Sequence, residues 1–227
     1  MKGLSMKVSL IIFTMNEVDG MKAIMPKINK DWYDELIIVD GGSTDGTIEF
    51  AQKEGYYIFV QEEKGAGAAF KEALRKATGD IVITFSPDGN SLPEKIPEIV
   101  VKIKEGYDVV TVSRYLCGAK SYDDDAFTAF GNSMFTWLVN LLFKTNYTDV
   151  LVMYHGFKRE AIQALNIHTK TPSWGTLLLL RATKKRLRIA EIPGDEPKRI
   201  SGLRKMKPLI NGSCELFMIV KEFLKRN

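Results

Sequence analysis

The first 115 residues alternate short apolar runs with helical segments, and this regularity limits the folds that the chain can adopt. The runs are apolar throughout, so both faces of the sheet that they form need a cover of helices. The pattern predicts an α/β fold with a mostly parallel sheet. We expect strands at VSLIIF (8–13), ELIIVD (35–40), YYIFVQ (56–61), IVITFS (81–86) and DVVTVSR (108–114), with helices at 20–28, 46–55, 66–80 and 93–106.

After about residue 115 the alternation stops and longer helical segments take over. No internal repeat and no low-complexity linker separates the two parts, so we expect a single domain over 1–227 with a smaller second half from residue 116. Helices are expected at 123–145, 158–166, 174–185 and 208–226, with one strand at 188–193.

Basic residues are concentrated in the second half, although the formal net charge is only +4. With 45% hydrophobic and 26% charged residues, the chain has the composition of a globular protein. The basic segments all follow residue 156. This distribution favours a phosphate-bearing partner or an anionic membrane surface and indicates no nucleic-acid partner.

Cysteine and histidine are too sparse for a disulfide framework or a zinc site. Cys117 and Cys214 lack CxxC spacing and are expected to be free thiols in a reducing compartment, while His155 and His168 are expected to be packed or surface residues. The apolar run at the N-terminus is predicted to be a strand and not a signal peptide. The stretch 135–143 is far shorter than the roughly 20 residues of a spanning helix. We expect a cytoplasmic protein, soluble or peripherally bound to a membrane.

Polar and glycine-rich segments follow each predicted strand. In a parallel α/β sheet, ligands bind outside the carboxyl ends of the strands, so these segments are the candidate site. They read FTMNE (13–17), VDGGSTDGT (39–47), QEEKGAGAA (61–69), FSPDGNSLPE (85–94) and SRY (113–115).

Each segment alone has a simple structural interpretation. DGGSTDGT can be a turn followed by a helix cap, or Asp40 can accept hydrogen bonds from a base or ribose while Gly41 and Gly42 let the ligand approach. Lys64 and Gly65 can open a helix packed closely on the sheet, or can meet a phosphate. The spacing lacks both GxGxxG and GxxxxGK[ST], which argues against a dinucleotide fold and excludes a P-loop.

Taken together and in this order, the segments resemble family 2 glycosyltransferases of the GT-A fold. The similarity is greatest to the dolichol-phosphate or polyprenyl-phosphate mannose synthase branch. It continues in TDVLVMYHGFKRE (148–160), which looks like that branch's Asp followed by a Gly-Phe turn, and in the basic loop AEIPGDEPKRISGLRKMK (190–207). The resemblance implies a Rossmann-like, mixed, mostly parallel sheet in which residues 1–115 bind a nucleotide sugar and 116–227 face the acceptor.

The resemblance also implies an inverting, metal-dependent transfer from a GDP- or UDP-sugar. In these enzymes a D-x-D-x-Q motif follows the fourth strand, and the matching positions are Ser86, Pro87, Asp88, Gly89 and Asn90. Asp88 and Asn90 are therefore the expected ligands of Mg²⁺ or Mn²⁺, bound weakly until the donor diphosphate completes the coordination. The residues expected to bind the nucleotide sugar are Thr14, Asn16, Glu17, Asp40, Gly41, Gly42, Lys64, Gly65, Ser86 and Asp88.

Arginines at two motif positions are the candidates for stabilising the leaving diphosphate, because guanidinium groups match phosphate oxygens. These are Arg114 and Arg199, which with Asp88 form the expected catalytic set. The acceptor phosphate is expected to contact Arg114, Arg199, Arg204 and Lys205.

The acceptor is inferred from a missing acid. Related transferases that use hydroxyl acceptors carry a general base at the start of a late helix, whereas TPSWGTLLLLRATKK (171–185) contains no acid. A phosphate is already an anionic nucleophile at neutral pH and needs no base, which favours a polyprenyl-phosphate-type acceptor. The stretch 135–143 then fits either an interfacial or a core helix.

Two alternatives remain open. In the first, the acceptor is a saccharide or small-molecule hydroxyl, with Glu191 or an acid of the 123–125 run as base, although that run is expected to be a solvated loop. In the second, Ser86 in place of an acid marks a nucleotide-sugar-binding protein with weakened catalysis. The sequence gives no indication of the oligomeric state.

Overall fold

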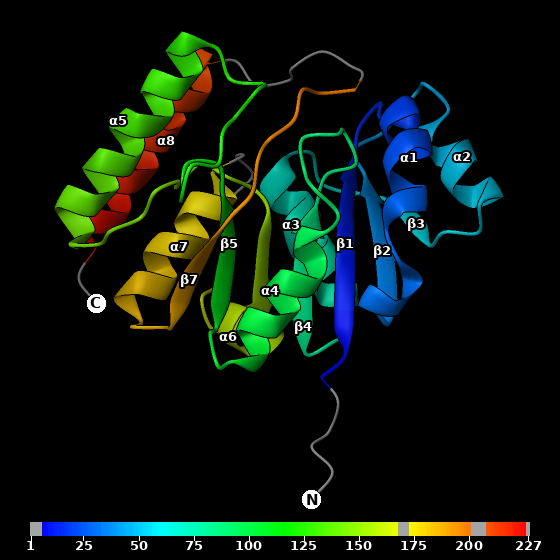
Figure 1. Ribbon diagram of the computed structural model, residues 1–227, viewed down its shortest axis with the longest axis horizontal. Coiled ribbons are helices and arrows are strands. Elements are labelled where there is room, and N and C mark those ends of the chain that lie inside the picture. The colour runs from blue at the N-terminus through cyan, green and yellow to red at the C-terminus, as the bar shows by residue number, and fades with distance from the viewer. Residues whose placement is uncertain (1–5, 168–172, 201–207, 226–227) are drawn as a thin grey trace, which may run out of the picture.

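A seven-stranded sheet forms the centre of the protein (Figure 1). The structure is a computed structural model, and it describes residues 6–167, 173–200 and 208–225. The strand order is β3-β2-β1-β4-β6-β5-β7, and β6 alone runs antiparallel to its neighbours. The strands are β1 (Val8–Thr14), β2 (Glu35–Asp40), β3 (Ile58–Val60), β4 (Ile81–Phe85), β5 (Val109–Ser113), β6 (His155–Lys158) and β7 (Ile189–Pro193).

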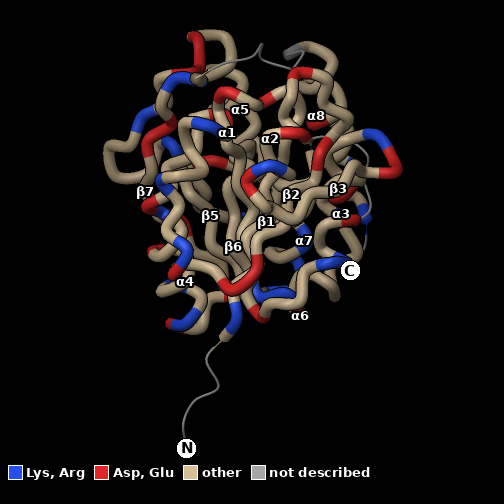
Figure 2. The backbone as a smooth tube through the Cα atoms, turned by 90° about the vertical axis from the view of Figure 1, so that its right-hand side faces the viewer, with Lys and Arg blue, Asp and Glu red and all other residues tan. Residues whose placement is uncertain are grey.

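Helices cover both faces of this sheet, as the wholly apolar strands require. They are α1 (Val18–Ile24), η1 (Met25–Lys27), η2 (Lys30–Trp32), α2 (Thr47–Lys53), α3 (Ala66–Lys76), α4 (Lys95–Lys104), α5 (Ala126–Phe143), α6 (Arg159–Gln163), α7 (Trp174–Lys184) and α8 (Pro208–Leu224). Figure 2 shows that the charged positions lie mostly on loops and helices around the strands.

Alternate residues of β1 join two different cores. Leu10 and Ile12 pack with side chains of α1, α2 and α4, whereas Ile11 packs with α3, α6 and α7. In the second core Phe70 stacks on Trp174, with ring centroids 4.1 Å apart. The two-sided cover predicted from the sequence is therefore confirmed.

Strand β6 corrects the expected Gly-Phe turn within 148–160. This four-residue strand lies between β4 and β5, so a segment of the second half completes the sheet begun by the first. At Gly156 a Cβ atom would lie 2.0 Å from Cγ2 of Ile99, so only glycine lets α4 pack against this strand. His155 is fully buried beside Thr111, and burial lowers its pKa to about 4, as expected for a packed histidine.

Helices α5 and α8 lie side by side beyond the β7 edge of the sheet (Figure 1). A small third core joins them to α7 through Phe135, Val139, Leu180 and Ile219. The stretch 135–143 therefore has a side packed in a core and an exposed side, and its position at a membrane interface stays a prediction.

Candidate active site

The candidate site lies where the chain changes direction across the sheet. Strand β1 pairs with β2 on one side and with β4 on the other, so the connections leaving the carboxyl ends of β1 and β4 diverge. Such a switch point is the usual ligand crevice of an α/β sheet. It brings together three of the segments that follow the strands.

Asp40 organises the loop after β2. It is fully buried, and its Oδ1 accepts hydrogen bonds from the backbone N–H groups of Gly42 and Ser43 at 2.8 and 2.7 Å. The Thr14 hydroxyl donates to Oδ2 at 2.7 Å, and the Ser43 hydroxyl donates to the same oxygen at 2.6 Å. In this structure Asp40 fixes the loop, and its contact with a nucleoside stays a prediction.

The loop after β1 is tied to the same turn. Asn16 accepts a hydrogen bond from the N–H of Thr44 at 2.8 Å, and its own N–H donates to the Ser43 hydroxyl at 2.7 Å. The N–H of Glu17 donates to Thr47 Oγ1 at 3.0 Å. Gly42 adopts a φ of +96°, which a residue with a side chain rarely adopts, so the turn depends on glycine there.

The Ser86–Asn90 turn packs between α1 and the loop that follows β7. At Gly20 in α1, a Cβ would lie 2.4 Å from the Pro87 carbonyl oxygen, so glycine lets the helix approach the turn. At Gly89, which has a φ of +96°, a Cβ would lie 2.6 Å from Cγ1 of Ile200. The turn that carries Asp88 is therefore packed closely on two sides.

Arg199 brings the acidic residues of the site together. Its Nη1 lies 3.0 Å from Oδ2 of Asp88 and 3.6 Å from Oε1 of Glu17. The backbone adds further contacts: the N–H of Ile200 donates to the Asp88 carbonyl at 2.9 Å, and Asn90 Nδ2 donates to the Pro197 carbonyl at 2.8 Å. Asp88, Asn90, Glu17 and Arg199, all predicted from the sequence, thus share one site.

The side-chain oxygens of the Ser86–Asn90 turn suit a hard divalent cation, but there are few of them. Oδ1 of Asp88 accepts the N–H of Asn90, and Oδ1 of Asn90 is buried without a hydrogen-bond partner among the residues that the structure describes. Ser86 lies half-buried at the end of β4. Among the described residues, no cluster of three or more acidic, His or Cys side chains could hold a metal ion. Since Mg²⁺ binds about six oxygens, a ligand must supply most of the coordination.

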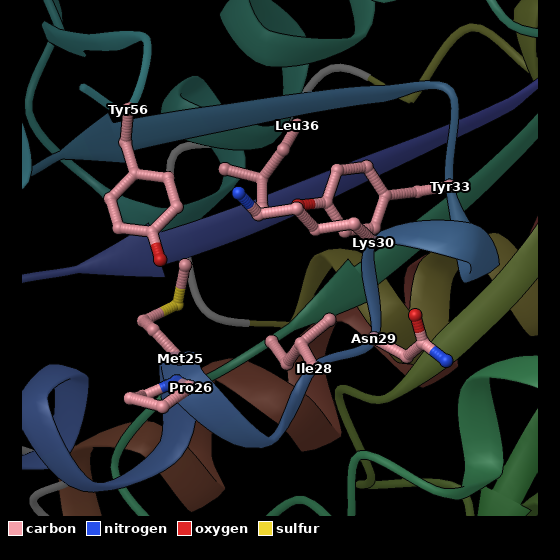
Figure 3. A pocket seen from close by; sticks show the side chains of 8 residues that line it. All are labelled: Met25, Pro26, Ile28, Asn29, Lys30, Tyr33, Leu36 and Tyr56. Atoms are coloured by element: carbon pink, nitrogen blue, oxygen red, sulfur yellow. The ribbon is translucent and has the colours of Figure 1, made fainter. Parts of the chain in front are cut away.

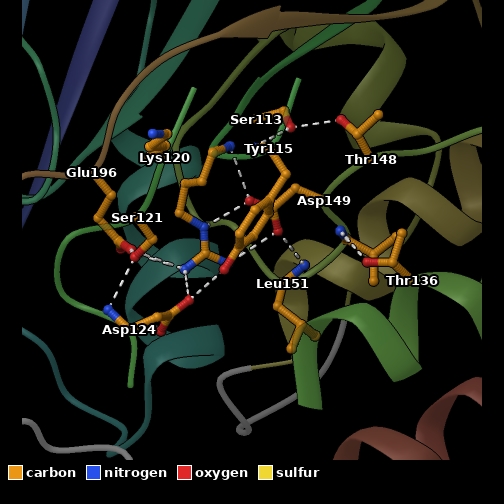
Figure 4. A network of polar contacts seen from close by, with 12 residues as sticks. Ser113, Tyr115, Lys120, Ser121, Asp124, Thr136, Thr148, Asp149, Leu151 and Glu196 are labelled. Carbon is orange, nitrogen blue, oxygen red and sulfur yellow. Dashed lines mark hydrogen bonds and ion pairs between the residues drawn. The ribbon is translucent and has the colours of Figure 1, made fainter. Parts of the chain in front are cut away.

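Arg114 forms a buried ion-pair network with Asp149, Asp124 and Glu196, which are labelled in Figure 4. Its Nε lies 2.6 Å from Asp149 Oδ2, and its Nη1 lies 3.2 Å from Glu196 and 3.4 Å from Asp124. Burial alone would lower the pKa of Arg114, but the three carboxylates outweigh it and raise that pKa well above its ordinary value. In this structure Arg114 fixes loops, and phosphate binding by it stays a prediction.

The expected solvated loop at 123–125 holds for Asp125, which is exposed, but not for Asp124, whose side chain is buried. Asp124 is nearly buried, accepts a hydrogen bond from the Tyr115 hydroxyl and pairs with Arg114. Asp125 caps α5 through the N–H of Thr128. Asp123 accepts the N–H of Arg199 at 3.3 Å, which places the run beside the site.

Other predicted residues lie farther away or outside the described part. Lys64 is exposed and Gly65 precedes α3 at the end of β3, with β2 and β1 between that strand and β4. Glu191 accepts hydrogen bonds from the N–H groups of Thr148 and Asp149, so it supports a loop. Residues outside the described part are His168, Arg204 and Lys205.

Glu215 of α8 is an acid that the sequence patterns did not indicate. Its carboxyl lies near the side chains of Ser173 and Thr176 at the start of α7, and burial raises its pKa. Its Oε1 is buried without a hydrogen-bond partner among the residues that the structure describes. The adjacent Trp174 lies 6.0 Å from the ring of Phe13, near the end of β1. The start of α7 therefore does meet an acid, although that acid comes from a helix about 40 residues later, a separation that local motif spacing does not reveal.

A separate pocket of about 370 Å³ lies at the opposite edge of the sheet (Figure 3). It is bordered by η1, η2 and the start of β2, and Tyr33 and Tyr56 line it. Because the amino ends of the strands lie there, this pocket is not part of the candidate site.

An α/β sheet with acid, amide and guanidinium groups at its switch point is the arrangement expected of a transferase that uses nucleotide sugars. The family model for glycosyl transferase family 2 matches residues 9–168, and the chain belongs to this family. The sequence-based assignment to a family 2 glycosyltransferase is thereby confirmed, whereas the roles of individual site residues stay predictions.

Two relatives show how far the sequence similarity extends. The dolichyl-phosphate hexose transferase of Haloferax volcanii is 28% identical over 219 residues, covering 96% of this chain and 94% of the relative. The undecaprenyl-phosphate 4-deoxy-4-formamido-L-arabinose transferase of Klebsiella pneumoniae is 28% identical over 200 residues. The match covers 82% of this chain but only 58% of that relative.

Solved structures confirm the expected fold. Glucosyl-3-phosphoglycerate synthase from Mycobacterium tuberculosis, in complex with Mn²⁺, UDP and phosphoglyceric acid, matches with a TM-score of 0.78. The match covers 98% of this chain and 80% of that one, at 19% identity. The same synthase has also been crystallised with Mg²⁺ and UDP. At this identity the likeness establishes the GT-A fold alone.

Proposed function

We propose that the protein transfers one sugar from a nucleoside-diphosphate sugar to a polyprenyl phosphate, with inversion at the anomeric carbon. The observation that carries this proposal is the contact of Arg199 with Asp88 at the switch point. The acceptor class is supported by the near full-length similarity to a dolichyl-phosphate hexose transferase. The donor is a GDP- or UDP-sugar, as the sequence resemblance implies.

On the donor side, Asp88 and Asn90 would hold a divalent metal. A bound Mg²⁺ or Mn²⁺ would neutralise charge on the leaving diphosphate. Arg199 is placed to exchange partners when the donor binds, because its Nη1 rests on the carboxylate that a metal would use. Its Nε is buried without a hydrogen-bond partner among the described residues and suits a diphosphate oxygen.

On the acceptor side, the phosphate needs no general base. One of its oxygens attacks the anomeric carbon, a new C–O bond forms, and the bond from that carbon to the diphosphate breaks with its electron pair. Arg114 positions the loop that leads to Arg199 by pairing with Glu196. We assign Arg204 and Lys205 to the acceptor phosphate and place the reaction on the cytoplasmic surface of a membrane, as the lipid acceptor requires.

A hydroxyl acceptor is the second candidate, and Glu215 favours it. Its buried carboxyl with a raised pKa at the start of α7 is a suitable general base. The variant Glu215→Gln separates the two reactions. Transfer to polyprenyl phosphate is expected to stay within about threefold of wild type, whereas a hydroxyl acceptor would lose about a hundredfold or more in rate.

The proposal is tested by a nucleotide panel followed by turnover. Thermal shift with UDP, GDP, dTDP and CDP, each with and without Mn²⁺, should show one nucleotide that stabilises the protein mainly when the metal is present. The matching nucleotide sugar is then assayed with polyprenyl phosphate and with simple glycosides. Metal-coupled binding without turnover on any acceptor would contradict the proposal and favour a binding protein.

A further inference from the structure

We propose that the exposed sides of α5 and α8 form one docking face for an anionic lipid membrane. The inference deepens the proposed function, since a lipid acceptor has to reach the site from a membrane. It rests on the exposed apolar residues of both helices, on the charges around them and on their position beside the site.

Helix α5 exposes a continuous apolar stripe. Its members recur every three or four residues and therefore lie on one side of the helix. They are Phe127, Phe130, Met134, Trp137 and Leu141, each 42–68% exposed. The opposite side carries Phe135 and Val139, which are buried in the third core. These five large apolar side chains make no core contact with the described residues that would explain them, and a row of such side chains in water is typical of an interaction surface.

Helix α8 widens this stripe. Its exposed apolar residues Ile210, Phe217, Val220 and Leu224 lie seven, three and four residues apart, so they share one side of the helix, and they are 40–72% exposed. The rings of Phe143 and Phe223 lie 5.8 Å apart, so the two helices pack directly against each other. Figure 1 shows the pair at the outer edge of the molecule.

The charges around this face favour anionic lipid. Helix α5 contains no Asp, Glu, Lys or Arg, and the acids of α8, Glu215 and Glu222, are both buried. The exposed charges at the carboxyl ends of the pair are Lys144, Lys221 and Lys225. An apolar stripe with basic residues at its border is the pattern of a helix that lies in the interface of an anionic membrane.

The packing of α5 indicates that it lies on the membrane and does not cross it. Within the described residues, α5 is the one helix long and apolar enough to span by length and composition. However, the side chain of Asn140 accepts the N–H of Tyr147 and donates to its carbonyl, which ties the helix to the protein body. A spanning helix would have to break these contacts and leave the third core.

The docking face also begins next to the candidate site. Asp123, three residues before α5, accepts the N–H of Arg199. Asp124 joins the Arg114 network in the same turn. A polyprenyl chain held in the membrane under α5 would therefore extend from the side of the molecule on which its phosphate has to reach Arg199.

Vesicle binding without acceptor or nucleotide tests the face. Co-sedimentation should show binding to phosphatidylcholine vesicles that contain phosphatidylglycerol, and clearly weaker binding to pure phosphatidylcholine. Trp137 is 63% exposed whereas Trp174 is 1% exposed, so the tryptophan emission should shift to the blue on binding, and the Trp137→Phe variant should remove the shift. The Phe130→Ser, Phe217→Ser double variant should bind at least tenfold more weakly. The control is Val101→Ser, since Val101 of α4 is also exposed, at 54%, and this variant should bind as wild type does.

Two results would overturn the inference. The first is equal or absent binding to both vesicle types. The second is a stable dimer in sedimentation equilibrium that the double variant dissociates, since the face would then bind a second copy. Activity on a short, water-soluble polyprenyl-phosphate analogue is measured separately. A lack of activity would contradict the proposed function, whereas vesicle binding alone tests whether α5 and α8 dock on a membrane.

Discussion

Nη1 of Arg199 lies 3.0 Å from Oδ2 of Asp88, so a cation of the loop after β7 contacts a carboxylate of the turn that follows β4. The same guanidinium lies 3.6 Å from Glu17, after β1. Before a donor binds, Arg199 thus neutralises the acids that the donor and its metal would use. This competition makes the metal affinity of the free protein depend on Arg199.

Removal of Arg199 should therefore separate metal binding from turnover. In Arg199→Ala, Mn²⁺ should bind the donor-free protein about fivefold more tightly, because an ion pair worth about 1 kcal/mol no longer competes. Transfer should nevertheless fall by about a hundredfold, since the leaving diphosphate loses a guanidinium. Titration calorimetry and initial rates measure the two effects, with Arg188→Ala as the control because Arg188 lies over Tyr107, away from the site. Unchanged metal affinity would mean that the ion pair does not compete.

Ser86→Asp should strengthen the metal site. A second carboxylate at the end of β4 adds an oxygen ligand of opposite charge to the cation, so Mn²⁺ should bind about tenfold more tightly in the absence of nucleotide. The neutral variant Ser86→Asn serves as the matched control and should bind the metal as wild type does. If the two variants behave alike, Ser86 does not face the metal.

The Arg114 network should dominate the stability of the second half. Arg114→Met leaves Asp149, Asp124 and Glu196 buried around a neutral side chain, which should lower the free energy of unfolding by about 3–5 kcal/mol. Arg159→Met is the control, because Arg159 Nε donates to the Gly79 carbonyl, an uncharged partner, and the loss of this hydrogen bond should cost about 1 kcal/mol. Urea unfolding compares the two variants. Equal losses would show that the network does not hold these loops together.

His155 should make the protein sensitive to mild acid. Burial lowers its pKa to about 4, below the value of about 6.5 in an unfolded chain. The unfolded state then binds the proton first, so stability is complete above about pH 6.5 and is lost as the pH falls through about 4, by about 3 kcal/mol in total. Urea unfolding of wild type and His155→Gln at several pH values isolates this contribution. Parallel pH profiles for the two proteins would contradict it.

The strands and the site segments were predictable because each is local. A wholly apolar run specifies a buried strand, and the residues after it necessarily lie at one edge of the sheet. The placement of Asp88 near Glu17 followed from this rule. Strand β6 did not, because four residues with a central glycine carry no strand pattern. The surroundings of Glu215 and the pairing of Arg114 with Asp149 and Glu196 were also hidden, since contacts between residues so far apart in the sequence depend on tertiary packing and leave no periodic signal.

The central claim, that Asp88 at the end of β4 serves metal-dependent sugar transfer to a lipid phosphate, is tested most directly by comparing Asp88→Asn with Asp80→Asn. Asp80 precedes the same strand at the opposite edge of the sheet, where it accepts the N–H of Lys7. Transfer to polyprenyl phosphate and Mn²⁺-coupled nucleotide binding should both fall by at least a hundredfold in Asp88→Asn, with Asp80→Asn close to wild type. Full activity of Asp88→Asn would contradict the account of this site.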